Sequence, residues 1–223
     1  MNEPIPVEVI RQIDGLALDA GRPLLICDAD EVLFAFLRGL DQFLHDGGLE
    51  LRLDSFALTG NIRHRHNGEA LEAADVRDLL QRFFAERTES LEPIDGAAAA
   101  LTGLSERMQV MVLTNIPQPQ RDARRRALRK HGMDFPVVAN AGRKGAAVAR
   151  LAARVEAPVV FVDDIPHNID SVAEHADDVI RLHFVGDERL ARMIGPASGA
   201  HARHDTWPEA RDYIEGELLQ RGY

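Results

Sequence analysis

Two carboxylates end a stretch of sequence that is otherwise apolar. Residues 24–34 read LLICDADEVLF: four apolar residues lead directly into Asp28 and Asp30, and three apolar residues follow Glu31. This pattern predicts a buried strand with two acids at its carboxyl end. Carboxylates that lie together in a dry environment raise each other's pKa and cost free energy, so they need a cation, water or a catalytic task.

Three further groups of polar residues lie where predicted strands end or a helix begins. They are Thr114 and Asn115 after the run QVMVL, Lys144 at the start of a helix, and Asp163 and Asp164 after the run VVFV. Ligands of open parallel sheets bind beyond the carboxyl ends of the strands. We therefore expect all of these side chains to share one crevice with the DAD segment.

Together these side chains predict chemistry on a phosphoryl group. Four acids in one pocket would repel one another, and a hard divalent cation such as Mg²⁺, which takes oxygen ligands, is the natural compensating charge. The lysine and the threonine remain to hold an anion with several oxygens, and phosphoryl transfer depends on cations placed around three equatorial oxygens. One carboxylate could act as the nucleophile, and a second could pass a proton to the leaving group.

The elements that would position these residues alternate between strand and helix. From residue 93 onwards, runs such as VMVL and VVFV lack the polar alternation of half-exposed strands, and helical patterns of about 10–15 residues separate them. We predict an α/β fold with a Rossmann-like, doubly wound parallel sheet core, formed by residues 1–34 and 93–223. Residues 35–92 predict a mostly helical cap, inserted after the first strand.

Apolar spacing also predicts individual helices. One covers residues 6–21 with Gly21 at its C-terminus, one covers residues 35–48, and another forms the tail, residues 207–223. In the helix of the core that reads RDARRRALRK, residues 121–130, we expect the basic side chains to form a solvated face.

The composition argues against several classes of partner. The net charge is −10 and the isoelectric point about 5.4, whereas nucleic acids and anionic membranes attract basic surfaces. The single cysteine, Cys27, cannot form an internal disulfide, and neither a signal-peptide pattern nor an apolar run long enough to span a membrane occurs. We expect a cytoplasmic protein that binds a small phosphorylated metabolite and no nucleic acid or membrane, while the oligomeric state stays open.

The order of these motifs resembles that of the haloacid dehalogenase superfamily. The matching residues are the D-x-D segment 28–30, Thr114, Lys144 and the acid pair within VDDIPHN, residues 162–168. The resemblance covers roughly residues 22–185, and the long gap before Thr114 is similar to the gap in members whose cap lies between the first two motifs (the C1 cap). The resemblance implies a hydrolase of the phosphatase type that requires Mg²⁺.

The resemblance also implies a role for each matching residue. Asp28 would be the nucleophile that becomes an aspartyl-phosphate, and also a metal ligand. Asp30 would act as general acid and then as general base, with its backbone carbonyl on the metal. Asp164, with Asp163, would complete the metal site. Thr114 and Lys144 would bind the phosphoryl oxygens, Asn115 is a further substrate-binding candidate, and Asn168 lies where the family often has a supporting acid or amide.

Asp30 favours a phosphatase over a dehalogenase, because an alkoxide leaving group needs a proton and a halide does not. One departure concerns the loop that follows: Glu31 and Val32 stand where the commoner motif D-x-D-G-T has Gly and Thr.

Other activities of the same residues stay open. One is a phosphomutase or another phosphoryl transferase on the same site, and another is a non-catalytic domain that accepts or binds phosphate. A phosphonate hydrolase is disfavoured, because it would want a lysine in the cap and residues 35–92 contain none. The order of the motifs disfavours a receiver domain of the phospho-accepting kind.

Residues 62–67, IRHRHN, form a basic stretch within the predicted cap. His64 and His66 lack the helical spacing and the partner acids of a zinc site, which disfavours a metal there. Two interpretations stay open: a loop that faces an anionic substrate, with Arg63 and Arg65 as the binding candidates, or an exposed loop without such a role.

Overall fold

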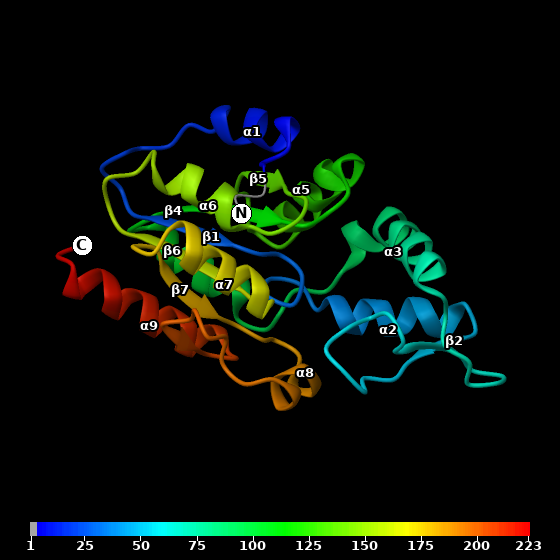
Figure 1. Ribbon diagram of the computed structural model, residues 1–223. Helices are drawn as coiled ribbons and strands as arrows, with labels where there is room; N and C mark the ends of the chain where they lie inside the picture. Colours follow the sequence, from blue (N-terminus) through cyan, green and yellow to red (C-terminus); the bar gives the residue numbers. More distant parts are fainter. Residues whose placement is uncertain (1–3) are drawn as a thin grey trace.

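A six-stranded parallel sheet forms the core of the computed structural model, which describes residues 4–223 (Figure 1). Its strand order is β5-β4-β1-β6-β7-β8, and every neighbouring pair is parallel. The strands are β1 (Leu24–Cys27), β4 (Gln109–Thr114), β5 (Val137–Ala139), β6 (Val159–Asp163), β7 (Ile180–His183) and β8 (Ala202–Arg203).

Helices cover both faces of this sheet, so that β1 is buried on both sides. Leu24 and Ile26 pack with one face and Leu25 and Cys27 with the other, as the alternation of a strand requires. On the first face lie α1 (Val7–Asp14), α6 (Gly145–Ala152) and α7 (Pro166–His175), and on the second lie α4 (Ala97–Ser105), α5 (Arg121–Lys130) and α9 (Trp207–Gln220). The prediction of a doubly wound parallel sheet is confirmed.

Residues 36–90, between β1 and α4, form a separate lobe, which Figure 1 shows beside the core at the end of the sheet where β1 ends. The lobe contains α2 (Phe36–Asp46), β2 (Leu49–Leu51), β3 (Ile62–His64), α3 (Ala73–Arg87) and the 3-10 turn η1 (Thr88–Ser90). Its two connections to the core run side by side, because Phe34 forms an antiparallel bridge with Pro93. A 3-10 turn η2 (Gln118–Gln120) and helix α8 (Glu188–Met193) complete the elements.

The first helix is shorter than predicted. We expected it to end at Gly21, but α1 ends at Asp14 and Gly15 takes the C-cap position. Glycine lowers helix propensity, and the next residues leave the helix so that Leu16 and Leu18 both pack against the core. Two apolar residues two positions apart share a face only in an extended chain, so the tertiary packing explains the early end.

Among residues 4–223, no helix combines the length and the apolar character needed to cross a membrane.

Candidate active site

The order of the strands brings the predicted acids together. Because β1 lies between β4 and β6, the loop after Cys27 lies beside the carboxyl ends of both neighbours. The backbone N–H of Asp28 continues the sheet by donating to the Val162 carbonyl at 2.9 Å. Side chains that lie more than 80 residues apart in the sequence therefore meet at one edge of the sheet.

Lys144 joins two of these acids by short ion pairs. Its Nζ lies 2.8 Å from Asp28 Oδ1 and 2.7 Å from Asp163 Oδ2, and the lysine side chain is fully buried. Burial acts to lower the pKa of the Lys144 ammonium, but the two carboxylates outweigh it and raise that pKa above its ordinary value. Lys144 therefore stays charged and holds Asp28 in place.

Close packing of α6 against α7 places this lysine. Lys144 is the N-cap of α6, and the next residue is Gly145. A Cβ atom on Gly145 would collide with the backbone carbonyl of Ser171 in α7. Glycine at this position therefore allows the two helices to approach closely, and this approach brings Lys144 to the acids at the carboxyl ends of β1 and β6.

Asp28, Asp163 and Asp164 form a buried cluster in which one carboxylate oxygen of each lies within 4.8 Å of the others. Burial, together with repulsion from the neighbouring acids, raises the pKa of Asp164 well above its ordinary range, and burial also raises the pKa of Asp28. A divalent cation with oxygen ligands would compensate these charges, so the donor set fits Mg²⁺.

The two adjacent acids of β6 have different environments. Both oxygens of Asp163 have protein partners: Oδ2 pairs with Lys144, and Oδ1 accepts hydrogen bonds from Ile165 N at 2.9 Å and Asn168 Nδ2 at 3.0 Å. Within residues 4–223, the Asp164 carboxylate accepts no hydrogen bond. Asp164 is therefore the freer of the two to bind a cation, and Asp163 mainly positions Lys144 and Asn168.

Thr114 and Asn115 lie at the end of β4, as predicted. The buried Thr114 hydroxyl has no hydrogen-bond partner within the described residues, and a buried polar group of this kind normally requires one. Asn115 donates to the Gly142 carbonyl at 2.9 Å and accepts from Asn140 Nδ2 at 2.8 Å. The unsatisfied threonine hydroxyl is thus available to an oxygen of a bound anion.

Asp30 lies outside this cluster and has a partner that the sequence did not suggest. Arg124 Nη2 in α5 lies 2.5 Å from Asp30 Oδ1, and its guanidinium lies over the Phe34 ring at 4.9 Å from the centroid. Burial raises the pKa of the Asp30 carboxyl, and Arg124 opposes that shift. The ion pair fixes the direction of this carboxylate.

The prediction of a solvated basic face is wrong for Arg124, whose side chain is fully buried. Its position three and four residues before the buried Ala127 and Leu128 places it on the apolar face of α5. That spacing was the signal that could have identified it.

Comparison with known proteins supports the fold. No protein-family model matches the sequence, and no curated protein matches it either. Among solved structures, the chain is similar to a conserved haloacid dehalogenase-like protein of unknown function from Agrobacterium tumefaciens. The TM-score is 0.60 at 19% identity, over 88% of this chain and 99% of that one.

Two more neighbours share this architecture. A hydrolase of the same family from Deinococcus radiodurans, with bound phosphate and sodium, gives a TM-score of 0.60 at 17% identity, over 90% and 98% of the two chains. The hydrolase YfnB from Bacillus subtilis, described as putative and bound to magnesium, gives 0.58 at 14% identity, over 88% and 99%. This chain has the haloacid dehalogenase-like fold.

Glu31 stands where the commoner D-x-D-G-T motif has glycine, and its backbone and side chain each have a distinct role. Glu31 has a φ of 58°, in the left-handed region that favours glycine. Its buried carboxylate accepts a hydrogen bond from the backbone N–H of Leu37 at 2.5 Å. The backbone of Glu31 is therefore strained, while its side chain caps the first turn of α2. Helix α2 is the first element of the lobe.

Replacing Glu31 with glutamine is expected to increase stability at neutral pH and above. Burial raises the pKa of Glu31 from 4.5 to about 7. An acid with a raised pKa in the folded state gives stability that is full below pH 4.5 and is lost as the pH rises through about 7. The shift corresponds to about 3 kcal/mol, and glutamine keeps the acceptor for Leu37 without the charge.

The measurement is urea unfolding of both proteins at pH 4.5 and pH 8, with a chelator present. Glu31→Gln should gain about 3 kcal/mol relative to the wild type between the two pH values. A difference between the two proteins that does not change with pH would contradict the raised pKa.

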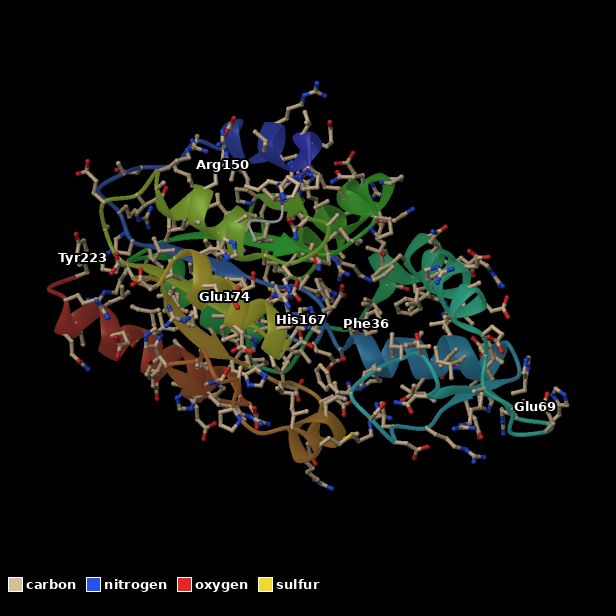
Figure 2. All side chains as sticks on the ribbon, in the orientation of Figure 1. Phe36, Glu69, Arg150, His167, Glu174 and Tyr223 are labelled. Atoms are coloured by element: carbon tan, nitrogen blue, oxygen red, sulfur yellow. The ribbon has the colours of Figure 1, made fainter. Side chains whose placement is uncertain are left out.

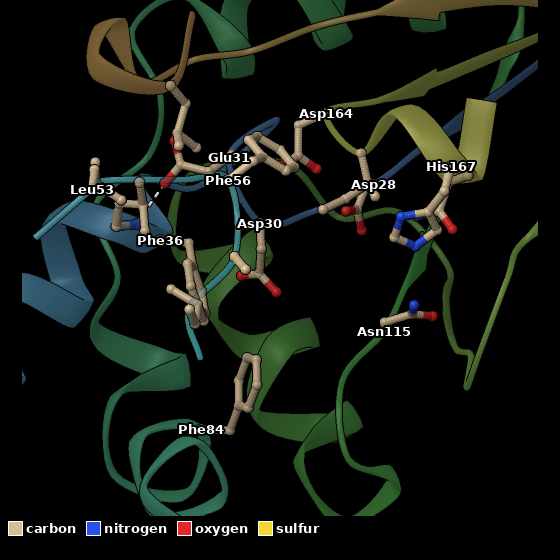
Figure 3. Close-up of a pocket in the computed structure, with 16 residues that line it drawn as sticks. Asp28, Asp30, Glu31, Phe36, Leu53, Phe56, Phe84, Asn115, Asp164 and His167 are labelled. Carbon is tan, nitrogen blue, oxygen red and sulfur yellow. Dashed lines mark hydrogen bonds between the residues drawn. The ribbon is translucent and has the colours of Figure 1, made fainter. Parts of the chain in front are cut away.

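A cavity of about 280 Å³ lies between the core and the lobe, and it is lined in part by Asp28, Asp30 and Asp164. Figure 3 shows Phe36 and Phe84 on one side of Asp30 and Asp28 on the other. His167, at the start of α7, lines the cavity beside Asn115 and is labelled with the other side chains in Figure 2. No pattern in the sequence predicted the apolar side of this cavity.

Arg63 does not line this cavity. It lies in β3, where Nη1 donates to the Gly68 carbonyl at 3.1 Å and Nη2 lies 3.9 Å from Asp54. Its guanidinium is held by groups of the lobe itself, so the structure does not bring Arg63 to the acids at the end of the sheet.

Proposed function

We propose that the protein is a Mg²⁺-dependent phosphatase of the haloacid dehalogenase superfamily, which hydrolyses a small phosphomonoester through an aspartyl-phosphate. One observation carries this proposal: Asp28, held by the buried Lys144, has a carboxylate oxygen within 4.8 Å of oxygens of Asp163 and Asp164, and Asp28 and Asp164 line a cavity. The unsatisfied Thr114 hydroxyl supports it. Two neighbours of the same fold support it as well: the Deinococcus radiodurans hydrolase has bound phosphate, and YfnB has bound magnesium.

In the first step, an oxygen of Asp28 attacks phosphorus and the bond from phosphorus to the ester oxygen breaks. Asp30 gives its proton to the departing alkoxide. Burial raises the pKa of Asp30 and Arg124 opposes that rise, which suits a carboxyl group that gives a proton in this step and takes one in the next. Lys144 and Thr114 bind phosphoryl oxygens and keep the phosphorus aligned with the nucleophile.

In the second step, the Asp30 carboxylate takes a proton from water, the water oxygen attacks phosphorus, and the bond to Asp28 breaks. Phosphate leaves and both acids return to their starting states. Asp28, the Asp30 backbone carbonyl and Asp164, supported by Asp163, would hold Mg²⁺. When bound, this ion supplies positive charge that stabilises the phosphoryl oxygens and reduces the repulsion between them and the nucleophile.

The charges that line the cavity support hydrolysis over a phosphomutase reaction. A mutase binds a sugar that carries a second phosphate during its cycle, and such a group needs a second cationic site. Among the described residues that line the cavity, every ionisable side chain except that of His167 is an acid, and none is an arginine or a lysine. A cytoplasmic location stays a prediction from the sequence.

Removing the metal tests the proposal. The purified protein should release phosphate from p-nitrophenyl phosphate in Mg²⁺ and lose at least about 100-fold in rate in EDTA, because a catalytic metal contributes several kcal/mol. Excess Mg²⁺ should restore the rate. Turnover that persists unchanged after chelation would contradict the proposed site.

A further inference from the structure

We infer that the organic group of the substrate is uncharged and apolar, and about the size of one ring. The inference rests on the proposed phosphatase function, because it concerns the group that is esterified to the phosphate. It comes from the wall of the cavity that faces the acids.

The lobe supplies an apolar wall to this cavity. Six of its side chains line the space: Phe36, Leu37, Leu53, Phe56, Leu58 and Phe84. They come from the start of α2, from the loop between β2 and β3, and from the end of α3. Figure 3 shows the Phe36 and Phe84 rings close to Asp30, the residue that would protonate the leaving group. The leaving group of the ester would therefore lie against these rings.

The lobe offers little to a polar or charged leaving group. No arginine or lysine occurs among the described residues that line the cavity. Its polar members all lie outside the apolar wall: the acids Asp28, Asp30, Glu31 and Asp164, together with Asn115, His167 and Asn168. A second anionic group placed against the apolar wall would have no arginine or lysine beside it, and sugar hydroxyls placed there would lose water without gaining partners. An apolar group, in contrast, gains free energy by leaving water for this wall.

The size of the cavity limits the group that fits. A cavity of about 150 Å³ is large enough for benzene, and here a volume of about 280 Å³ must hold the phosphate as well. One ring or an alkyl chain of similar size fits within this volume beside the phosphate, whereas most of a nucleotide would extend beyond it. We therefore assign the substrate class as small aromatic or aliphatic phosphomonoesters.

The test compares benzyl phosphate with glucose 6-phosphate. Both release an alcohol rather than a phenol, so a difference in kcat/KM reports mainly on binding of the organic group. Burial of one ring predicts that kcat/KM is about 10- to 100-fold higher for benzyl phosphate. Equal or better turnover of glucose 6-phosphate would overturn the inference while leaving the phosphatase activity intact.

Two variants locate the effect. Phe84→Ala should lower kcat/KM for benzyl phosphate about 10-fold and change that for glycerol 3-phosphate little. Ala57→Arg adds a cation to a lining position, so it should improve turnover of 3-phosphoglycerate relative to benzyl phosphate, and it does so without opening a void. Leu219→Ala, on an exposed part of α9, should change neither ratio. If both lining variants behave like Leu219→Ala, the assignment of the wall is wrong.

A binding measurement separates this inference from the proposed reaction. By isothermal titration calorimetry in Mg²⁺, benzylphosphonate should bind about 10- to 100-fold more tightly than methylphosphonate. If no ester is hydrolysed but this preference holds, the proposed function fails and the apolar ligand site stands. Equal affinity for the two phosphonates would overturn the inference, whatever the turnover.

Discussion

Replacing Asp28 with asparagine is expected to lower the rate of phosphomonoester hydrolysis by at least about 10⁴-fold, as is typical for loss of a catalytic nucleophile. The asparagine side chain has nearly the same shape, and its amide oxygen can take the place of Asp28 Oδ1, which lies 2.8 Å from Lys144 Nζ. The loss would therefore come from the missing nucleophilic carboxylate. Steady-state release of phosphate from p-nitrophenyl phosphate in Mg²⁺ measures it.

Asp14→Asn is the matched control, because Asp14 makes an exposed ion pair with Arg150 outside the site. It should leave kcat unchanged, and circular dichroism should show that both variants fold. Turnover by Asp28→Asn within 10-fold of the wild type would remove Asp28 as the nucleophile and, with it, the aspartyl-phosphate.

Asp30→Asn distinguishes the two acids of the DAD segment. The p-nitrophenolate group departs without a proton, whereas an alkoxide needs one. The variant should therefore lose more activity on benzyl phosphate than on p-nitrophenyl phosphate, and equal losses would argue against proton transfer by Asp30.

The second large effect concerns stability. Replacing Lys144 with methionine is expected to lower the free energy of unfolding by about 3–5 kcal/mol in a chelating buffer. The lysine is fully buried between Asp28 and Asp163, and its removal leaves two buried acids without their cation. Urea unfolding in EDTA measures the loss, because a bound metal ion would compensate part of it.

Arg150→Met provides the control on the same helix, α6. Arg150 pairs with Asp14 at 2.7 Å, but both side chains are more than a third exposed, so the cost should stay below about 1 kcal/mol. If both variants lost the same free energy of unfolding, burial would not strengthen the ion pairs of Lys144 over an exposed pair.

Most of the candidate site residues could be predicted, because the apolar pattern of a buried strand also shows at which end its polar residues lie. The apolar runs before Asp28, Thr114 and Asp163 predict buried parallel strands, and the carboxyl ends of such strands meet at one edge of a sheet. The predicted parallel sheet and the observed cluster of Asp28, Asp163 and Asp164 follow from this rule. The rule does not show which of these acids pair with Lys144.

The division of roles between Asp163 and Asp164 required coordinates. The two residues are adjacent in the sequence and of the same type, so no pattern separates them. In the structure, successive side chains at the end of β6 point in different directions, and only Asp163 reaches Lys144 and Asn168. The backbone strain at Glu31 also required coordinates, since its φ angle depends on the path of the loop between the core and the lobe.

The sequence by itself determined the sheet, the acids at its edge and the phosphoryl chemistry that they suggest, because strand periodicity and residue type are local properties. Only the tertiary structure decided that Arg124 is buried against Asp30 and that three separate segments of the lobe form an apolar wall. Periodicity shows that a helix face is buried but not what buries it. Those contacts join residues far apart in the chain, and the packing of the whole molecule selects them.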